Sequence, residues 1–177
     1  MNTSENTAIV PHAPRRRPTL TITAGPLSAG KSSWVRSFRT DDDTTLCLIR
    51  DEVRADVGGE GYLDGPVSPE VEESVTAYIR DQVIRALAED KDVYLDGCNN
   101  HPLTRSRWES LATENSAEFR LMFFNLSLEQ IAALNDRRQA PHSREKVESS
   151  FRYWEEQFRK IMSRPQHHFI NGERALA

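Results

Sequence analysis

Cysteines and long apolar runs are both scarce in this sequence of 177 residues. Its two cysteines, Cys47 and Cys98, have no spacing typical of a metal site and fit a reduced, cytoplasmic setting. No apolar run approaches the roughly 20 residues that a membrane-spanning helix needs, so no membrane partner is expected. The arginine cluster at residues 15–17 precedes a short strand pattern rather than the apolar segment of a signal peptide.

A basic excess is also missing. The chain has 23 lysines and arginines against 27 aspartates and glutamates, for a net charge of −4. A protein that coats nucleic acid normally presents a broad basic surface, so this class is disfavoured. An enzyme that acts only on a strand end needs just a local basic channel, and the net charge does not exclude it. The length suits one domain with a sizeable core.

Glycine is limited to eight residues, but two of them frame the strongest motif in the chain. Residues 25–32 match the phosphate-loop pattern G-x-x-x-x-G-K-[ST], and they join a strand pattern to a helical one. Backbone N–H groups at such a junction can surround phosphate, and the helix dipole favours its charge. The alternative, a glycine turn that binds nothing, would need neither lysine nor serine here. We expect ATP to bind the loop residues Gly25, Pro26, Leu27, Ser28, Ala29, Gly30, Lys31, Ser32 and Ser33.

Two residues of the motif and one later acid predict the donor chemistry. Lys31 is expected to reach the β- and γ-phosphates, and the Ser32 hydroxyl to bind Mg²⁺. Asp96 ends an apolar strand pattern, where a second acid commonly holds Mg²⁺, with Asn99 as a polar neighbour. The alternative for Asp96 is a turn aspartate before Gly97.

Asp51 and Arg54 follow the second strand pattern, at the start of a short helix. Their spacing places both side chains toward one side of that helix. The acid could accept the proton of an attacking hydroxyl, and the arginine could bind a phosphate of the acceptor. The alternative is a local ion pair without an acceptor role.

A third group of residues predicts a lid. Asn135, Arg137 and Arg138 end one helical pattern, and Pro141 separates it from a long helix that reaches about Met162. Arginines on a closing lid can stabilise a transferring phosphoryl group and exclude water. A solvated basic helix end is the alternative.

Strand and helix patterns alternate along the chain, which predicts an α/β fold with a parallel sheet flanked by helices on both faces. Strands are expected at about residues 19–24, 44–49, 93–96 and 119–124, and the first helix should reach about Arg39. Ser68 and Pro69 mark a helix start, followed by the apolar stripe Val71, Val75, Ile79, Val83 and Leu87.

These segments together resemble the kinase domain of the polynucleotide 5′-hydroxyl kinase family, which includes the phage enzyme and bacterial end-healing relatives. The family loop G-x-P-G-S-G-K-S is similar to residues 25–32, and its R-D-D-x-R motif to residues 50–54. Its D-x-T-N motif is similar to residues 96–99, and its N-x-x-R lid motif to residues 135–138. The order and spacing hold over residues 19–162. The chain departs from the family pattern at Leu27, Ser28, Glu52, Cys98 and Ala140.

The resemblance implies a P-loop kinase fold with a helical lid around residues 135–162. The polar, proline-containing composition of residues 1–18 predicts a disordered lead, so the kinase domain would cover residues 19–177. The resemblance also implies that Asp51 is the general base for a 5′-hydroxyl, that Arg54 binds the neighbouring phosphate, and that Arg138 contacts the donor phosphates in the transition state.

The sequence therefore predicts an ATP- and Mg²⁺-dependent phosphotransferase whose acceptor is the 5′-hydroxyl end of DNA or RNA. A kinase of a nucleoside, a sugar or an antibiotic is the nearest alternative, and the negative net charge suits it. A nucleotide-binding switch without an acceptor is a further alternative, which the Asp51–Arg54 pair disfavours.

Overall fold

Five parallel strands form one sheet in the order β2-β3-β1-β4-β5. The computed structural model describes residues 16–58, 68–161 and 168–171. The strands are β1 (Thr19–Ala24), β2 (Thr45–Ile49), β3 (Asp92–Asp96), β4 (Glu118–Asn125) and β5 (His168–Asn171). The helices are α1 (Lys31–Arg36), α2 (Arg50–Gly58), α3 (Pro69–Ala88), α4 (Pro102–Glu114), α5 (Leu128–Asp136) and α6 (Arg144–Ile161).

Strand β1 lies in the middle of the sheet and pairs with β3 on one side and β4 on the other. All six of its residues are buried. Successive side chains of a strand point to opposite faces, so Leu20 and Ile22 enter one layer while Thr21 and Thr23 enter the other. Burial on both faces is typical of a parallel sheet covered by helices.

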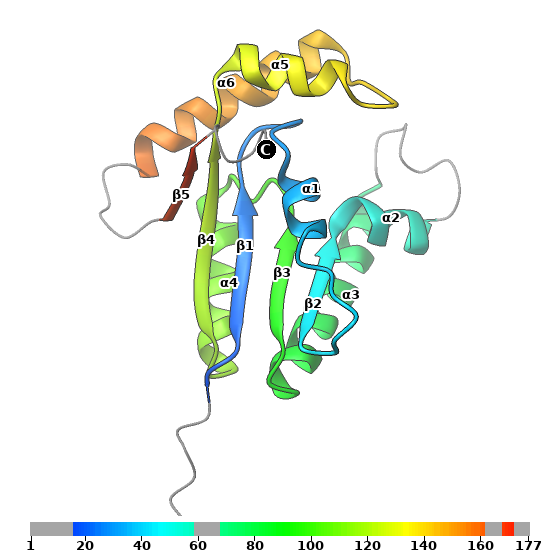
Figure 1. The fold of residues 1–177 in the computed structure, drawn as a ribbon, viewed down its shortest axis with the longest axis vertical. Coiled ribbons are helices and arrows are strands. Elements are labelled where there is room, and N and C mark those ends of the chain that lie inside the picture. Colours follow the sequence, from blue (N-terminus) through cyan, green and yellow to red (C-terminus); the bar gives the residue numbers. More distant parts are fainter. Residues whose placement is uncertain (1–15, 59–67, 162–167, 172–177) are drawn as a thin grey trace, which may run out of the picture.

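Helices cover both faces of the sheet and the edge where the strands end (Figure 1). Helices α3 and α4 lie behind the sheet in that view, α1 lies in front, and α5 and α6 cross above the carboxyl ends of the strands. The larger core joins β1, β3 and β4 to α3 and α4, and the smaller core contains Phe124, Ile131 and Val147. The expected α/β fold, a parallel sheet with helices on both faces, is confirmed.

The predicted start and buried stripe of α3 are confirmed. The Ser68 hydroxyl accepts a hydrogen bond from the Val71 N–H, and Pro69 is the first helical residue. Val75, Ile79, Val83 and Leu87 are buried, and Val71, at the start of the stripe, is only partly buried against the core. None of the described helices combines the length and the apolar character that crossing a membrane requires.

Two elements differ from the expectation. Helix α1 ends at Arg36 rather than near Arg39. The N–H groups of residues 38 and 39 bond to carbonyls three residues back, in tight turns rather than in an α-helix. In this conformation the Phe38 ring stacks on Tyr94 of β3. The short edge strand β5 was not expected, since four residues carry little periodicity. Residues 1–15 of the expected lead and most of a glycine-rich loop at residues 58–65 lie outside the described residues.

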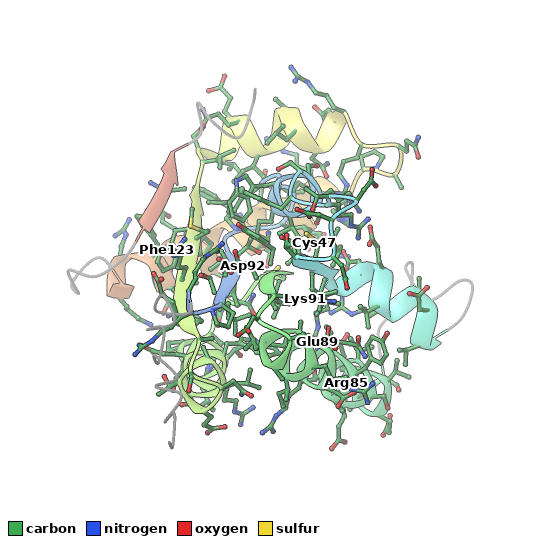
Figure 2. All side chains as sticks on the ribbon, turned by 60° about the horizontal axis from the view of Figure 1, so that its bottom comes forward. Cys47, Arg85, Glu89, Lys91, Asp92 and Phe123 are labelled. Carbon is green, nitrogen blue, oxygen red and sulfur yellow. The ribbon has the colours of Figure 1, made fainter. Side chains whose placement is uncertain are left out.

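Ion pairs hold the opposite edge of the sheet, where the strands begin (Figure 2). Lys91 pairs with Glu89 and Asp43, at 2.8 and 2.6 Å. Asp92 pairs with Arg16 and accepts a hydrogen bond from the Thr19 N–H at 2.9 Å. These contacts attach the start of β1 to β3 at the end of the sheet away from the phosphate loop.

Replacing Ile79 by alanine should lower the free energy of unfolding by about 2–5 kcal/mol, because it leaves a cavity in the main core. Ile79 is fully buried, whereas the adjacent Tyr78 is 47% exposed. The matched Tyr78→Ala variant should change stability by less than about 0.5 kcal/mol. Urea unfolding of both variants checks this, and equal losses would contradict the assignment of the buried face.

Candidate active site

The phosphate loop leaves β1 through a glycine that has no room for a side chain. Gly25 has φ of 153°, and an added Cβ would lie 2.9 Å from Phe124 Cβ and 3.0 Å from the Phe124 carbonyl oxygen. Gly30, with φ of 84°, precedes α1 in a left-handed conformation. The loop residues 25–30 thus lie between the end of β1 and the N-terminus of α1, the position that favours anion binding.

Two asparagines that follow β3 hold the start of the loop. The Asn100 side chain accepts a hydrogen bond from the Gly25 N–H at 2.9 Å and donates to its carbonyl at 3.2 Å. Asn99 donates to the Thr23 carbonyl at 2.8 Å. Arg105 donates to the carbonyls of both asparagines, at 3.1 and 2.6 Å. The sequence reasoning missed Asn100 and Arg105, although two adjacent asparagines after a buried strand were a usable signal.

The residues expected at the donor phosphates and metal lie together. Lys31 is buried, and its Nζ donates to the Pro26 carbonyl at 2.6 Å, across the loop. The Ser32 hydroxyl donates to Asp96 Oδ2 at 2.6 Å, and the Thr23 hydroxyl donates to Asp96 Oδ1 at 3.2 Å. Asp96 is only 5% exposed, so a buried carboxylate stands next to the serine of the motif.

This pair of oxygen donors fits Mg²⁺. Magnesium prefers oxygen ligands and usually keeps several waters, with one or two protein ligands and substrate phosphates completing its shell. Ser32 and Asp96 offer two oxygen atoms of this kind beside the loop, and they could hold the ion. Within residues 16–58, 68–161 and 168–171, no three histidine, cysteine or acidic side chains gather as a metal cluster.

Asp51 and Arg54 lie on α2, just beyond the end of β2, and form an ion pair with each other. Arg54 also pairs with Glu72 of α3, and Glu72 accepts a hydrogen bond from Arg50 at 2.7 Å. Partial burial alone would lower the pKa of Arg54, but its bonds and charge contacts with Glu72 and Asp51 raise it. The local ion pair considered as an alternative is therefore present, and Glu72 is a partner that sequence reasoning missed.

Glu52, where the family motif has an aspartate, faces α1. It pairs with Arg36 at 3.0 Å and also with Arg39. Partial burial raises the pKa of Glu52, but the hydrogen bonds and charges of the two arginines lower it by more. The longer side chain thus attaches α2 to the segment around α1, and it leaves Asp51 as the acid that pairs with Arg54.

The residues expected in the lid lie at the end of α5 and in the turn that leads to α6. Figure 1 shows these two helices above the carboxyl ends of the strands. Arg137 and Arg138 are exposed, whereas Asn135 is buried. Burial lowers the pKa of His142 in this turn, and the charges of Arg138 and Lys146 lower it further, against an opposing effect of Asp51.

Two hydrogen bonds join the lid helices to the loop. The Leu27 N–H donates to the Ser150 hydroxyl of α6 at 2.9 Å, and the Ser28 hydroxyl donates to Asn135 Oδ1 of α5 at 3.0 Å. The loop, Asp51, Asp96 and the lid turn thus gather at the carboxyl edge of the sheet, where open α/β sheets bind ligands.

Glu72→Gln should lower the free energy of unfolding by about 1 kcal/mol near pH 7, because it breaks a partly buried ion pair. Partial burial raises the pKa of Glu72, but Arg54 and Arg50 hold it below its ordinary value of 4.5. The stabilisation is therefore complete above that value and is lost as the pH falls through the lower pKa of the folded state.

Urea unfolding of the wild type and the variant from about pH 7 to about pH 3 checks this sign, since the difference between them should shrink toward acid pH. Glu73→Gln, at the adjacent exposed position, is the matched control. A difference that stays constant with pH would contradict the assignment.

Comparisons with known proteins place the chain in a family. The family model described as AAA domain matches residues 20–161. No curated protein matches the sequence significantly. A chain of the Pnkp1/Rnl/Hen1 RNA repair complex superposes with a TM-score of 0.69 at 23% identity, over 89% of this chain and 49% of that one. This chain thus spans about half the length of that relative.

Two other solved structures share the fold. A gluconokinase from Sinorhizobium meliloti 1021 has a TM-score of 0.59 at 14% identity, over 89% of this chain and 83% of its own. Chaetomium thermophilum Kti12 in complex with ADP-AlF3 has a TM-score of 0.54 at 17% identity, over 76% of this chain and 79% of its own. The resemblance inferred from the motifs is confirmed by the match to the repair-complex chain, and the chain is a member of the AAA domain family with a P-loop kinase-like fold.

Proposed function

We propose that this protein transfers the γ-phosphoryl group of ATP to the 5′-hydroxyl end of a DNA or RNA strand. The observation that carries the proposal is the gathering of two sets of groups at one edge of the sheet. Lys31, Ser32 and Asp96 form the donor side, and the Asp51–Arg54 pair forms the acceptor side. A nucleotide-binding switch would need only the donor side.

In the proposed reaction, the acceptor oxygen forms a bond to the γ-phosphorus while the bond from that phosphorus to the β–γ bridging oxygen breaks. Asp51 takes the proton of the acceptor hydroxyl, and ADP leaves. Lys31 and the loop N–H groups hold the donor phosphates, and Arg138 contacts the equatorial oxygens. Ser32 and Asp96 would hold Mg²⁺, which would supply positive charge to neutralise the phosphates.

The choice of acceptor rests on Arg54. Arg54 lies three residues from Asp51, and its Nε and one Nη donate to Glu72 and Asp51. A guanidinium has five N–H donors, so Arg54 can also bind an acceptor phosphate next to the reacting nucleoside. The likeness to a chain of an RNA repair complex supports a nucleic-acid end. A small-molecule kinase is the second candidate, because the gluconokinase shares the fold over most of both chains and the net charge is −4.

Asp51→Ala should lower the rate of phosphoryl transfer at least about 100-fold, because it removes the general base. The affinity for ATP should stay within about twofold, since Asp51 lies on α2 rather than in the phosphate loop. The assay follows labelled γ-phosphate from ATP to a short strand that ends in a 5′-hydroxyl.

The same strand with a 5′-phosphate is the substrate control, and Asp56→Ala, an exposed acid of the same helix, is the matched protein control. Unchanged turnover in Asp51→Ala would disprove the base assignment. Absence of transfer by the wild type, together with measurable ATP binding, would point to a small-molecule acceptor or to a switch.

Arg54→Ala separates the two acceptor classes. It should raise KM about 10- to 100-fold for an acceptor that carries a phosphate beside its reacting nucleoside, because charge-assisted hydrogen bonds are lost. For a nucleoside without phosphate, or for gluconate, KM should change less than about threefold. Steady-state kinetics with each acceptor measures this, and equal effects on both would contradict the role of Arg54.

A further inference from the structure

The phosphate loop contains a serine where the backbone favours glycine. Ser28 has φ of 61°, in the left-handed region that an L-residue enters only at a cost of roughly 1–2 kcal/mol. It is 9% exposed, and its hydroxyl donates to Asn135 Oδ1 at 3.0 Å. Since glycine would adopt this conformation without strain, the serine side chain has to contribute something that glycine cannot.

Its partner, Asn135, holds both ends of the lid turn. Its Oδ1 accepts a second hydrogen bond, from the His142 N–H at 3.0 Å, and its Nδ2 donates to the His142 carbonyl at 2.9 Å. Its backbone carbonyl accepts from the Arg138 N–H at 3.1 Å. Asn135 is 5% exposed, so these bonds are shielded from water and a lost partner is costly.

The bonds form one continuous connection from the phosphate loop to Arg138. Ser28 contacts Asn135, and Asn135 closes the turn of residues 136–142, on which Arg138 lies. The Arg138 side chain itself makes only a long contact in this turn, Nε to the Ala140 carbonyl at 3.4 Å. The position of Arg138 therefore depends on the backbone of the turn, and through Asn135 on Ser28.

We propose that Ser28 and Asn135 are positioning residues that place Arg138 over the phosphate loop. The inference rests on the proposed function for the role of Arg138 in phosphoryl transfer. When a nucleotide fixes the loop, the Ser28 hydroxyl is fixed with it, and the closed lid turn is stabilised. By linkage, the closed turn stabilises the nucleotide-bound loop to the same extent.

Two substitutions of Ser28 distinguish an effect on the lid turn from an effect on the stability of the whole protein. Ser28→Ala loses the hydrogen bond and keeps the strained backbone, whereas Ser28→Gly loses the bond and relieves the strain. Ser28→Gly should therefore unfold at a higher urea concentration than Ser28→Ala. Both should loosen the lid turn to the same degree, and Asn135→Ala should loosen it at least as much.

Hydrogen exchange of the amides of residues 136–142, in the protein without nucleotide, measures the lid turn directly. Both Ser28 variants should increase the exchange rates of these amides about three- to tenfold, which corresponds to the net free energy of one hydrogen bond. The exchange rates of the amides of α3 should stay unchanged. Ser74→Ala, an exposed serine of α3, should leave the turn unaffected. If exchange of the turn amides were slower in Ser28→Gly than in Ser28→Ala, it would follow the stability of the variants rather than the lost hydrogen bond. This result would overturn the inference.

Kinetics with Arg138→Ala then tests the positioning role. Ser28→Gly should lower kcat for transfer about three- to tenfold with KM for ATP within about twofold, and should have no further effect in an Arg138→Ala background. Independent, multiplicative effects would overturn the inference. A wild type that transfers no phosphate would instead disprove the proposed function, and the exchange comparison would still decide whether Ser28 and Asn135 hold the turn.

Discussion

The site depends on the position of β1 in the middle of the sheet. Because β1 is buried on both faces and paired on both sides, the point where the chain leaves it is held by both neighbouring strands. The phosphate loop starts there, next to Asp96 at the end of β3 and the two asparagines that follow it. Backbone N–H groups of a loop are preorganised to bind an anion only if hydrogen bonds to neighbouring segments fix the conformation of that loop.

Much of this arrangement could be predicted from the sequence, because its signals are local. The phosphate-loop pattern located Lys31 and Ser32, the alternation of elements gave the parallel sheet, and the strand ends placed Asp51 and Asp96 at one edge. The helix cap at Ser68 was also predictable, since it involves residues three apart in the chain. The roles of these site residues remain proposals that the kinetics above address.

The features that could not be predicted from the sequence are contacts between residues far apart in the chain. Glu72 on α3 pairs with Arg50 and Arg54 of α2, and Asn100, in the segment after β3, binds Gly25. No spacing rule connects such pairs. The early end of α1 was missed for the same reason, because the stacking of Phe38 on Tyr94 involves a strand that comes later in the chain.

The close contact between Gly25 and β4 gives the first glycine of the motif a structural role that does not depend on nucleotide binding. The Phe124 backbone oxygen, and not only its side chain, lies 3.0 Å from the place of an added Cβ, so a smaller residue at 124 would not make room. The glycine is therefore required by the spacing of two neighbouring strands. In evolutionary terms, a descendant that had lost nucleotide binding would still keep it while Lys31 and Ser32 drifted. Among distant homologues, residues such as the lysine and serine, and not this glycine, would distinguish a working nucleotide site from one that has lost its function.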